Sequence, residues 1–321
     1  MSAPKGRGVA WTEERGARNE RRATRESGAL SAPEAQSKHP MSQVLLAERP
    51  GLSGAPNARW ASLPNALHAE WTKLRTVAGP AWLLAATVVL TVAVSAAATA
   101  AVRCPSGIAC PVDTTKLSLS GIQLGQAVVA ILAVLAISGE YSTGMIRITL
   151  TAMPRRSAVL AAKAAILTGL VLAAGTIAVL GSLLAGRLIL PGHGFTAARG
   201  FPLLSLGDGP VLRAAAGSVL YFALIALLSL GIATAVRDSA VAIGIVLGLL
   251  YLFPIIAGVV TDPHWHRHLE QIGPMNAGLD IQATTGLSSL PLSPWAGLGV
   301  LAAWAAGALL AGGLLFRLRD A

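Results

Sequence analysis

The sequence predicts an all-α, polytopic membrane protein with six transmembrane helices. Six stretches lack Asp, Glu, Lys, Arg and His, and each contains 22 to 25 residues. About 20 helical residues cross the hydrocarbon core of a bilayer, and a charged residue at the centre of such a helix costs roughly 2.5–3.5 kcal/mol. The six stretches are Pro80–Val102, Leu117–Ser138, Ala164–Gly186, Ala214–Val236, Ser239–Thr261 and Leu292–Phe316.

The composition supports a helical bundle in lipid. The chain is 54% hydrophobic and 12% charged, which excludes an ordinary soluble domain and a disordered chain. Its apolar residues are mostly small or aliphatic, and small residues let helices approach closely in lipid. The net charge of +10 comes from scattered basic residues, several beside the predicted spans, where they would contact anionic lipids. No basic recognition motif is present, so we expect membrane lipids and no nucleic acid as partners.

Residues 1–64 differ from the rest of the chain. They hold ten Lys or Arg and six Asp or Glu, together with many Gly, Pro and Ser, and they show no hydrophobic periodicity. We predict a disordered basic N-terminal tail. No apolar core follows the basic residues, so this tail is not a signal peptide, and Met41 is a second candidate for the translation start.

Residues 65–79 predict an amphipathic helix at the membrane interface. Asn65 is a suitable N-cap, and Gly79–Pro80 predicts a break before the first span. A cytoplasmic extension of that span is the alternative. The apolar face is Leu67, Trp71, Leu74 and Ala78, and the charged residues on the other sides include Glu70, Lys73 and Arg75.

The distribution of Lys and Arg predicts the orientation. With the N-terminus inside, nine of these residues lie on or beside the cytoplasmic face and six lie on the other side. We therefore expect a multi-pass protein of the cell membrane with both termini in the cytoplasm, the C-terminal one being residues 317–321. The fourth and fifth spans are separated only by Arg237–Asp238 and should form a tight hairpin.

The segment 140–156, between the second and third spans, predicts a short cytoplasmic helix. A hydroxyl residue near its start can cap it, and Pro154 ends it. Apolar faces flank a basic stripe, which suits docking on another protein. The alternative is a surface helix that only connects two spans.

Two segments resemble a known family. They are Glu70-Trp71-Thr72-Lys73-Leu74-Arg75-Thr76, and Glu140-Tyr141-Ser142-Thr143-Gly144-Met145-Ile146-Arg147 followed by Pro154-Arg155-Arg156 and Lys163. With the six-span layout, they make residues 65–321 similar to the membrane subunits of ABC-2-type ATP-binding-cassette transporters, particularly actinobacterial permeases. The resemblance implies a dimer with a second copy or a paralogue, and export of a substrate.

The resemblance also assigns roles to residues. Glu70, Trp71, Lys73 and Arg75 would belong to the interfacial helix. The coupling helix contacted by the ATPase would contain Glu140, Gly144, Arg147, Arg155 and Arg156.

The chain itself has no nucleotide-binding motif. A P-loop requires Gly-x-x-x-x-Gly-Lys-Ser/Thr, and no such run occurs. We therefore expect no enzyme activity and no cofactor in this chain, and ATP hydrolysis in a separate cytoplasmic subunit. A membrane scaffold or assembly protein is the alternative function. An intramembrane enzyme is a weaker one, because the charge-free spans offer no acid or base.

Polar residues at three further places suggest roles. Gln123 and Gln126 in the second span could line a substrate path, although hydrogen bonding between helices is the plainer interpretation. Cys104 and Cys110 lie in the first loop on the far side and could form a disulfide or stay free.

The last loop on that side, 262–291, could contain short helices that dip toward the membrane. His264, His266 and His268 alternate there and would share one side only in an extended segment, so we predict no metal site.

Overall fold

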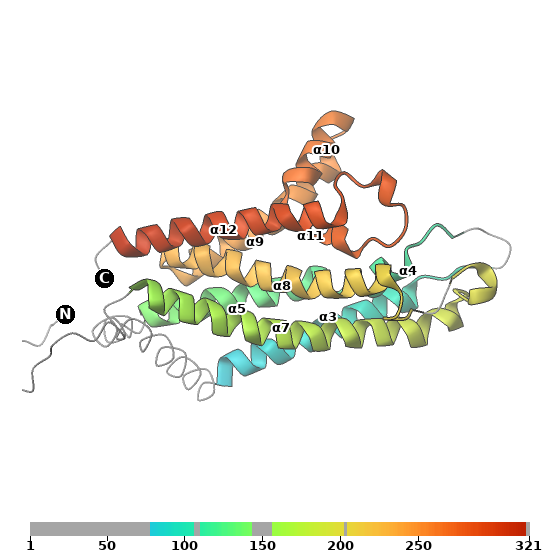
Figure 1. Ribbon diagram of the computed structural model, residues 1–321, viewed down its shortest axis with the longest axis horizontal. Helices are drawn as coiled ribbons and strands as arrows, with labels where there is room; N and C mark the ends of the chain where they lie inside the picture. Colours follow the sequence, from blue (N-terminus) through green and yellow to red (C-terminus); the bar gives the residue numbers. More distant parts are fainter. Residues whose placement is uncertain (1–77, 106–109, 143–155, 202–203, 319–321) are drawn as a thin grey trace, which may run out of the picture. The chain divides into compact units, whose positions relative to one another are not determined.

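The computed structural model describes residues 78–105, 110–142, 156–201 and 204–318 (Figure 1). The predictions for the tail 1–64, for the interfacial residues 65–77, for residues 143–155 and for 319–321 lie outside the described residues. The described residues form helices joined by turns and contain no strand.

Six helices are long and apolar enough to cross a membrane, which confirms the predicted all-helical fold with six candidate spans. They are α3 (Ala78–Ala101), α5 (Ile122–Ser142), α7 (Arg156–Ile189), α8 (Gly209–Val236), α9 (Ser239–Val259) and α12 (Pro294–Leu318). Helix α3 includes Gly79 and Pro80, so the chain is already helical where a break was expected.

Short helices occur in the three connections at one end of the bundle, segments 102–121, 190–208 and 260–293, which we call the capped end. The opposite end, where α3 begins and α12 ends, is the terminal end. The short helices are α4 (Thr114–Ser118), η2 (Leu190–His193), η3 (Ala197–Arg199), α10 (Pro263–Ile272), α11 (Pro274–Leu279), η4 (Asp280–Gln282) and η5 (Leu287–Ser289).

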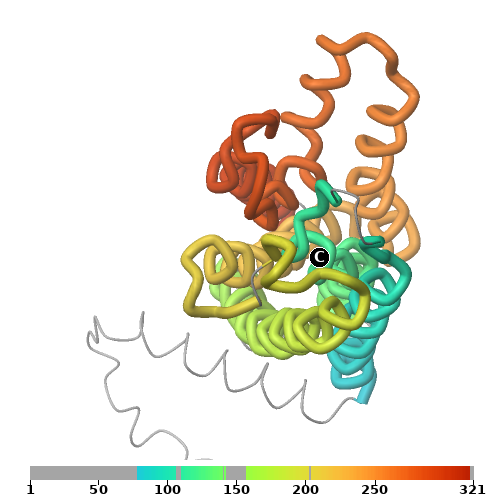
Figure 2. The backbone as a smooth tube through the Cα atoms, turned by 90° about the vertical axis from the view of Figure 1, so that its right-hand side faces the viewer, coloured from blue at the N-terminus to red at the C-terminus, as the bar shows by residue number. Residues whose placement is uncertain are grey.

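Helix α8 forms the centre of the bundle. It packs against α5, α7, α9 and α12, whereas α3 packs against α5 and α7 (Figure 2). Fully buried side chains of α8 include Tyr221, Phe222 and Ile225. The hydrophobic core therefore surrounds one helix.

Helix α3 turns small polar residues inward and apolar residues outward. Its buried residues are Thr87, Thr91, Ser95 and Thr99, which recur every four positions. In contrast, Trp82 is 74% exposed. Lipid is as apolar as a leucine side chain, so helix association in a membrane relies on close packing and hydrogen bonds instead. This face lets α5 approach, and the amide of Gly121 donates to Ser95 Oγ at 3.0 Å.

Two helix boundaries differ from the charge-free stretches. The second stretch begins at Leu117, but residues 114–118 form the separate helix α4, and α5 begins at Ile122. A Cβ at Gly121 would lie 2.0 Å from the carbonyl oxygen of Thr91, so this turn is set by contact with α3. Helix α7 begins eight residues before Ala164 and includes Lys163, whose side chain is 5% exposed. At 34 residues α7 is about 51 Å long, longer than the hydrocarbon core.

Glycines bring α8 and α12 into direct backbone contact. A Cβ at Gly231 would lie 2.5 Å from the carbonyl carbon of Ala308. A Cβ at Gly312 would lie 2.4 Å from the carbonyl oxygen of Gly231. Since backbone atoms cannot move aside as a flexible side chain can, these positions require glycine.

Replacing Gly231 by Ala should therefore destabilise the bundle by about 1–3 kcal/mol, because the added methyl group overlaps the backbone of α12. The matched control is Gly244→Ala in α9, where an added Cβ meets no atom within 4 Å. Unfolding in mixed micelles, followed by circular dichroism, measures the difference. Equal stability of the two variants would contradict the proposed contact.

Candidate functional site: a polar junction under the capped end

The short helix α11 lies inside the bundle. Pro274, Met275, Ala277, Gly278 and Leu279 are buried, and α11 packs against α8, α9 and α12. The expectation of short helices in the last loop is thus confirmed. A buried segment that is not itself a span is joined to the spans by its polar contacts as well as by its packing. We take the polar contacts of α11 as the candidate site.

Gln126 joins three helices through one side chain. It is fully buried in α5, and its Oε1 accepts a hydrogen bond from the hydroxyl of Tyr221 in α8. Its Nε2 lies 3.1 Å from Sδ of Met275 in α11. A thioether is a weak acceptor, so the bond to Tyr221 holds the amide in place and the contact to Met275 is the more easily broken. We call Gln126, Tyr221 and Met275 the polar junction.

Gln123 lies one turn away and has a different environment. Its side chain is exposed, and only its backbone carbonyl makes a contact, accepting from the Tyr251 hydroxyl of α9 at 2.5 Å. The two glutamines therefore do not act as a pair. Gln126 forms bonds between helices, whereas the amide of Gln123 remains on the surface of α5.

A second polar contact fastens the capped end. Asp113 caps α4 by accepting from the amides of Thr115 and Lys116, each at 3.1 Å. The same carboxylate accepts from the Thr284 amide at 2.5 Å, from Thr284 Oγ1 at 2.8 Å and from the Thr285 amide at 3.0 Å. One carboxylate thus joins the first connection to the last. We call this contact the Asp113 clamp.

The clamp also reaches α8. The guanidinium of Arg213 donates to the carbonyl oxygen of Ala283, next to Thr284. Because η4 lies between α11 and the clamp, holding residues 283–285 also holds the far end of α11. The sequence pattern Asp-Thr-Thr at 113–115 is typical of a helix cap, but it gives no sign of a partner 171 residues away.

Two half-buried acids of the capped end have opposite pKa shifts. Burial raises the pKa of Asp113, whereas hydrogen bonds from Thr284, Lys116 and Thr285 lower it. The hydrogen bonds together have the larger effect, so the pKa lies below its usual value. Burial raises the pKa of Asp280 to about 6; the nearby Lys116 opposes this shift and Glu270 adds to it. Asp113 is held ionised, while Asp280 titrates near neutral pH.

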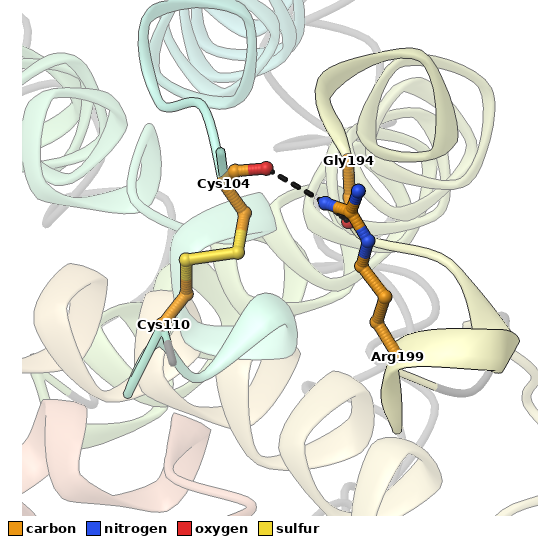
Figure 3. Close-up of a disulfide and its surroundings, with 4 residues drawn as sticks. All are labelled: Cys104, Cys110, Gly194 and Arg199. Atoms are coloured by element: carbon orange, nitrogen blue, oxygen red, sulfur yellow. Dashed lines mark hydrogen bonds between the residues drawn. A yellow bond between two sulfur atoms is a disulfide. The ribbon is translucent and has the colours of Figure 1, made fainter. Parts of the chain in front are cut away.

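A disulfide orders the chain before the clamp. Cys104 and Cys110 are bonded, with their Cα atoms 6.0 Å apart. Figure 3 shows the side chain of Arg199 reaching toward this bridge, where it donates to the Cys104 carbonyl at 2.9 Å and to the Gly194 carbonyl at 3.4 Å. The amide of Cys104 donates to the His193 carbonyl at 2.9 Å. These contacts tie the first connection to the second.

The three histidines of the last connection are separated by helical geometry. Helix α10 places His264 against His268 in an edge-to-face contact, with ring centroids 4.4 Å apart. His266 instead contacts Glu270 at 3.3 Å and the Ala257 carbonyl at 2.9 Å. In the part of the chain that the structure describes, no three potential ligands are grouped as a metal site.

Most of the residues assigned by resemblance lie outside the described residues. Glu140 belongs to the last turn of α5, and Arg156 is the first residue of α7. Gly144, Arg147 and Arg155, together with the interfacial residues Glu70, Trp71, Lys73 and Arg75, are in segments that the structure does not describe.

Breaking the polar junction should loosen α11. Tyr221→Phe removes a donor to the buried Oε1 of Gln126, and hydrogen bonds between membrane helices contribute about 0.6–2 kcal/mol. We expect faster amide exchange in residues 274–282, measured by hydrogen–deuterium exchange. Gln123→Leu is the control, because it changes an exposed side chain on the same helix. Unchanged exchange in Tyr221→Phe would show that the junction does not hold α11.

Asp280 should make stability depend on pH. Its raised pKa means that the folded state retains a proton that the unfolded chain releases, so stability falls as pH rises from about 4 to about 6. Asp280→Asn should therefore melt at a higher temperature than the parent at pH 7.5, and the difference should shrink at pH 5. Asp208→Asn, at an exposed position before α8, should show no such pattern. The prediction fails if Asp280→Asn gains nothing at pH 7.5.

Searches for similarity gave no match: no protein-family model and no curated protein matches this chain. The family suggested by the two segments in the sequence stays a prediction.

Proposed function

We propose that this chain is the membrane-spanning permease subunit of an ATP-driven transporter of the ABC-2 type, acting as an exporter and energised by a separate cytoplasmic ATPase. The observation that carries the proposal is the segment between α5 and α7. Its sequence resembles a coupling helix, and it joins two candidate spans at the terminal end. In this proposal the terminal end is cytoplasmic, both chain ends lie there, and the protein belongs to the cell membrane.

The charge-free spans support an external energy source. The six stretches contain no carboxylate, histidine or basic residue that could relay protons or hold a counter-ion within the bilayer. The sequence also lacks a P-loop, so this chain cannot bind ATP by that route. A partner subunit that closes on ATP and pushes against a cytoplasmic segment would supply energy without an ionisable residue in the spans and without a P-loop in this chain.

Helix α5 offers a direct mechanical connection. It carries Glu140 in its last turn and Gln126 fourteen residues earlier, which is about 21 Å along a helix. A displacement of the 143–155 segment would therefore shift Gln126 against Tyr221 and Met275. Since the Met275 contact is the weaker one, we expect it to break first, and the separation of α5 from α11 would open a path at the capped end.

A second mechanical connection runs through α7. This helix starts where the 143–155 segment ends, packs against α3 and α8, and reaches the capped end at Ile189. The capped end itself is fastened by the disulfide and the Asp113 clamp. In the proposed cycle, motion enters at the terminal end while the clamp keeps the first and last connections together.

Charge reversal at Arg147 tests the proposal. If 140–156 is a docking surface, Arg147→Glu should weaken ATPase binding, because an arginine that pairs with a partner carboxylate becomes repulsive. Gly144→Leu should act in the same direction by straining a turn. The measurement is ATP hydrolysis that co-purifies with the tagged full-length chain, together with identification of the bound P-loop subunit.

Arg267→Glu is the matched control. It reverses an exposed charge on α10, at the capped end, and should leave the co-purified ATPase unchanged. If Arg147→Glu and Gly144→Leu both retain the ATPase, the segment is not the coupling element. If the parent chain itself recovers no ATPase from its native membrane, the scaffold alternative is favoured instead.

A further inference from the structure

A groove opens between α7 and α12 at the terminal end. Its volume is about 480 Å³. Residues that line it include Ser157, Leu160 and Ala164 from α7, and Leu310, Gly313 and Arg317 from α12. Both helices pack against α8, and they also contact each other.

Small side chains keep the groove open. Ala164 and Gly313 lie on its two sides, and a Cβ at Gly313 would meet only Leu160 Cδ2, at 3.6 Å. This is an ordinary van der Waals distance, so glycine is not required here for close packing, in contrast to Gly231 and Gly312. A leucine at this position would project into the space and fill it.

The groove changes in polarity along its length. Ser157 is in the first turn of α7 and Arg317 is in the last turn of α12, so the hydroxyl and the charge lie at the terminal end. The remaining lining residues are apolar. An elongated apolar space with a cation and a hydroxyl at one mouth matches the shape and chemistry of an amphiphile with an anionic head.

The electrostatics at this mouth favour an anion. Helix α7 begins here without an acidic residue in its first turn, and the start of a helix carries a partial positive charge. Four basic residues lie at this end of the described helices and their connecting turn, against the two acids Glu140 and Asp238. The basic residues are Arg156, Lys163, Arg237 and Arg317.

We infer that this groove binds one anionic phospholipid, with an acyl chain along the apolar walls and the phosphate at Arg317 and Ser157. Arginine is suited to this task because its planar fork donates two parallel hydrogen bonds to a phosphate. The walls are formed by two candidate membrane spans, so a lipid can enter sideways, whereas a water-soluble peptide would have to leave water to do so.

Competition between two lipids tests the inference. The purified full-length chain in detergent is equilibrated with phosphatidylglycerol and phosphatidylcholine of equal acyl chains, and retained lipid is counted by native mass spectrometry. We expect the parent to prefer phosphatidylglycerol by about fivefold, the effect of one basic residue near an anionic surface. No transport is measured, so the result does not depend on the proposed function.

Two variants, each with a control, test separately the binding of the lipid headgroup and of its acyl chain. Arg317→Gln should abolish the preference and still retain lipid, and Arg267→Gln on α10 should keep the preference. Gly313→Leu should lose the bound lipid of either kind, because it fills the groove. Its control is Gly307→Leu on the same helix, where an added Cβ meets nothing within 4 Å. Size-exclusion chromatography and circular dichroism confirm that each variant is folded.

Three results would overturn the inference. One is equal retention of the two lipids by the parent. Another is a parent-like preference in both Arg317→Gln and Gly313→Leu. The third is displacement of phosphatidylglycerol by an equal concentration of glycerol 3-phosphate, which carries the phosphate without the chains and would identify a simple anion site.

Discussion

Close backbone contact around α8 is the constraint on which this bundle depends. Lipid supplies no hydrophobic force to bring helices together, so every pair must gain its stability from short contacts and hydrogen bonds. Gly231 and Gly312 provide this between α8 and α12, and the inward hydroxyl face of α3 provides it against α5. The side chains that a soluble protein would bury, such as Trp82, are left on the outside.

This packing divides the molecule into parts with different mobility. Where backbones touch, as between α8 and α12, a helix cannot slide without a clash. The α11 segment has contacts of both kinds. Its backbone touches α12, where a Cβ at Gly297 would lie 2.0 Å from the carbonyl oxygen of Ala277, and the weak contact between Gln126 and Met275 holds it against α5. A force that displaces α5 would therefore break its contact with α11 before it moved α11 along α12. The strong bonds of Asp113 lie beyond α11, and they restrict how far residues 283–285 can follow.

The sequence predicts which segments of the chain are suited to lipid and which are suited to water. Charge-free stretches of sufficient length indicate where lipid would lie, and they identify the six candidate spans among the described residues. They do not report contacts between helices, which is why the turn at Gly121 and the early start of α7 could not be predicted. Lys163 is an example. It directly precedes the charge-free stretch Ala164–Gly186, yet it lies within α7 and its side chain is buried.

The candidate site also combines features that local sequence predicts with contacts that only the neighbouring helices determine. Gln123 and Gln126 are both polar residues in one span, and only the neighbouring helices decide that Gln126 is buried and Gln123 is not. The histidines alternate in sequence, but a local helix brings His264 against His268 and leaves His266 with other partners. Asp113 has a recognisable local role as a cap, whereas its contact with Thr284 depends on the fold of the entire chain.

The Asp113 clamp also bears on how the protein is made. Asp113 can cap α4 as soon as residues 114–118 have emerged, because those donors are adjacent in sequence. Thr284 is synthesised 171 residues later, after α5, α7, α8 and α9 have been produced. Until then, part of the hydrogen-bonding capacity of the carboxylate must be met by water. The capped end thus closes only when the last connection arrives, and the donors of residues 284 and 285 then replace part of the water around Asp113 as one of the final events of assembly.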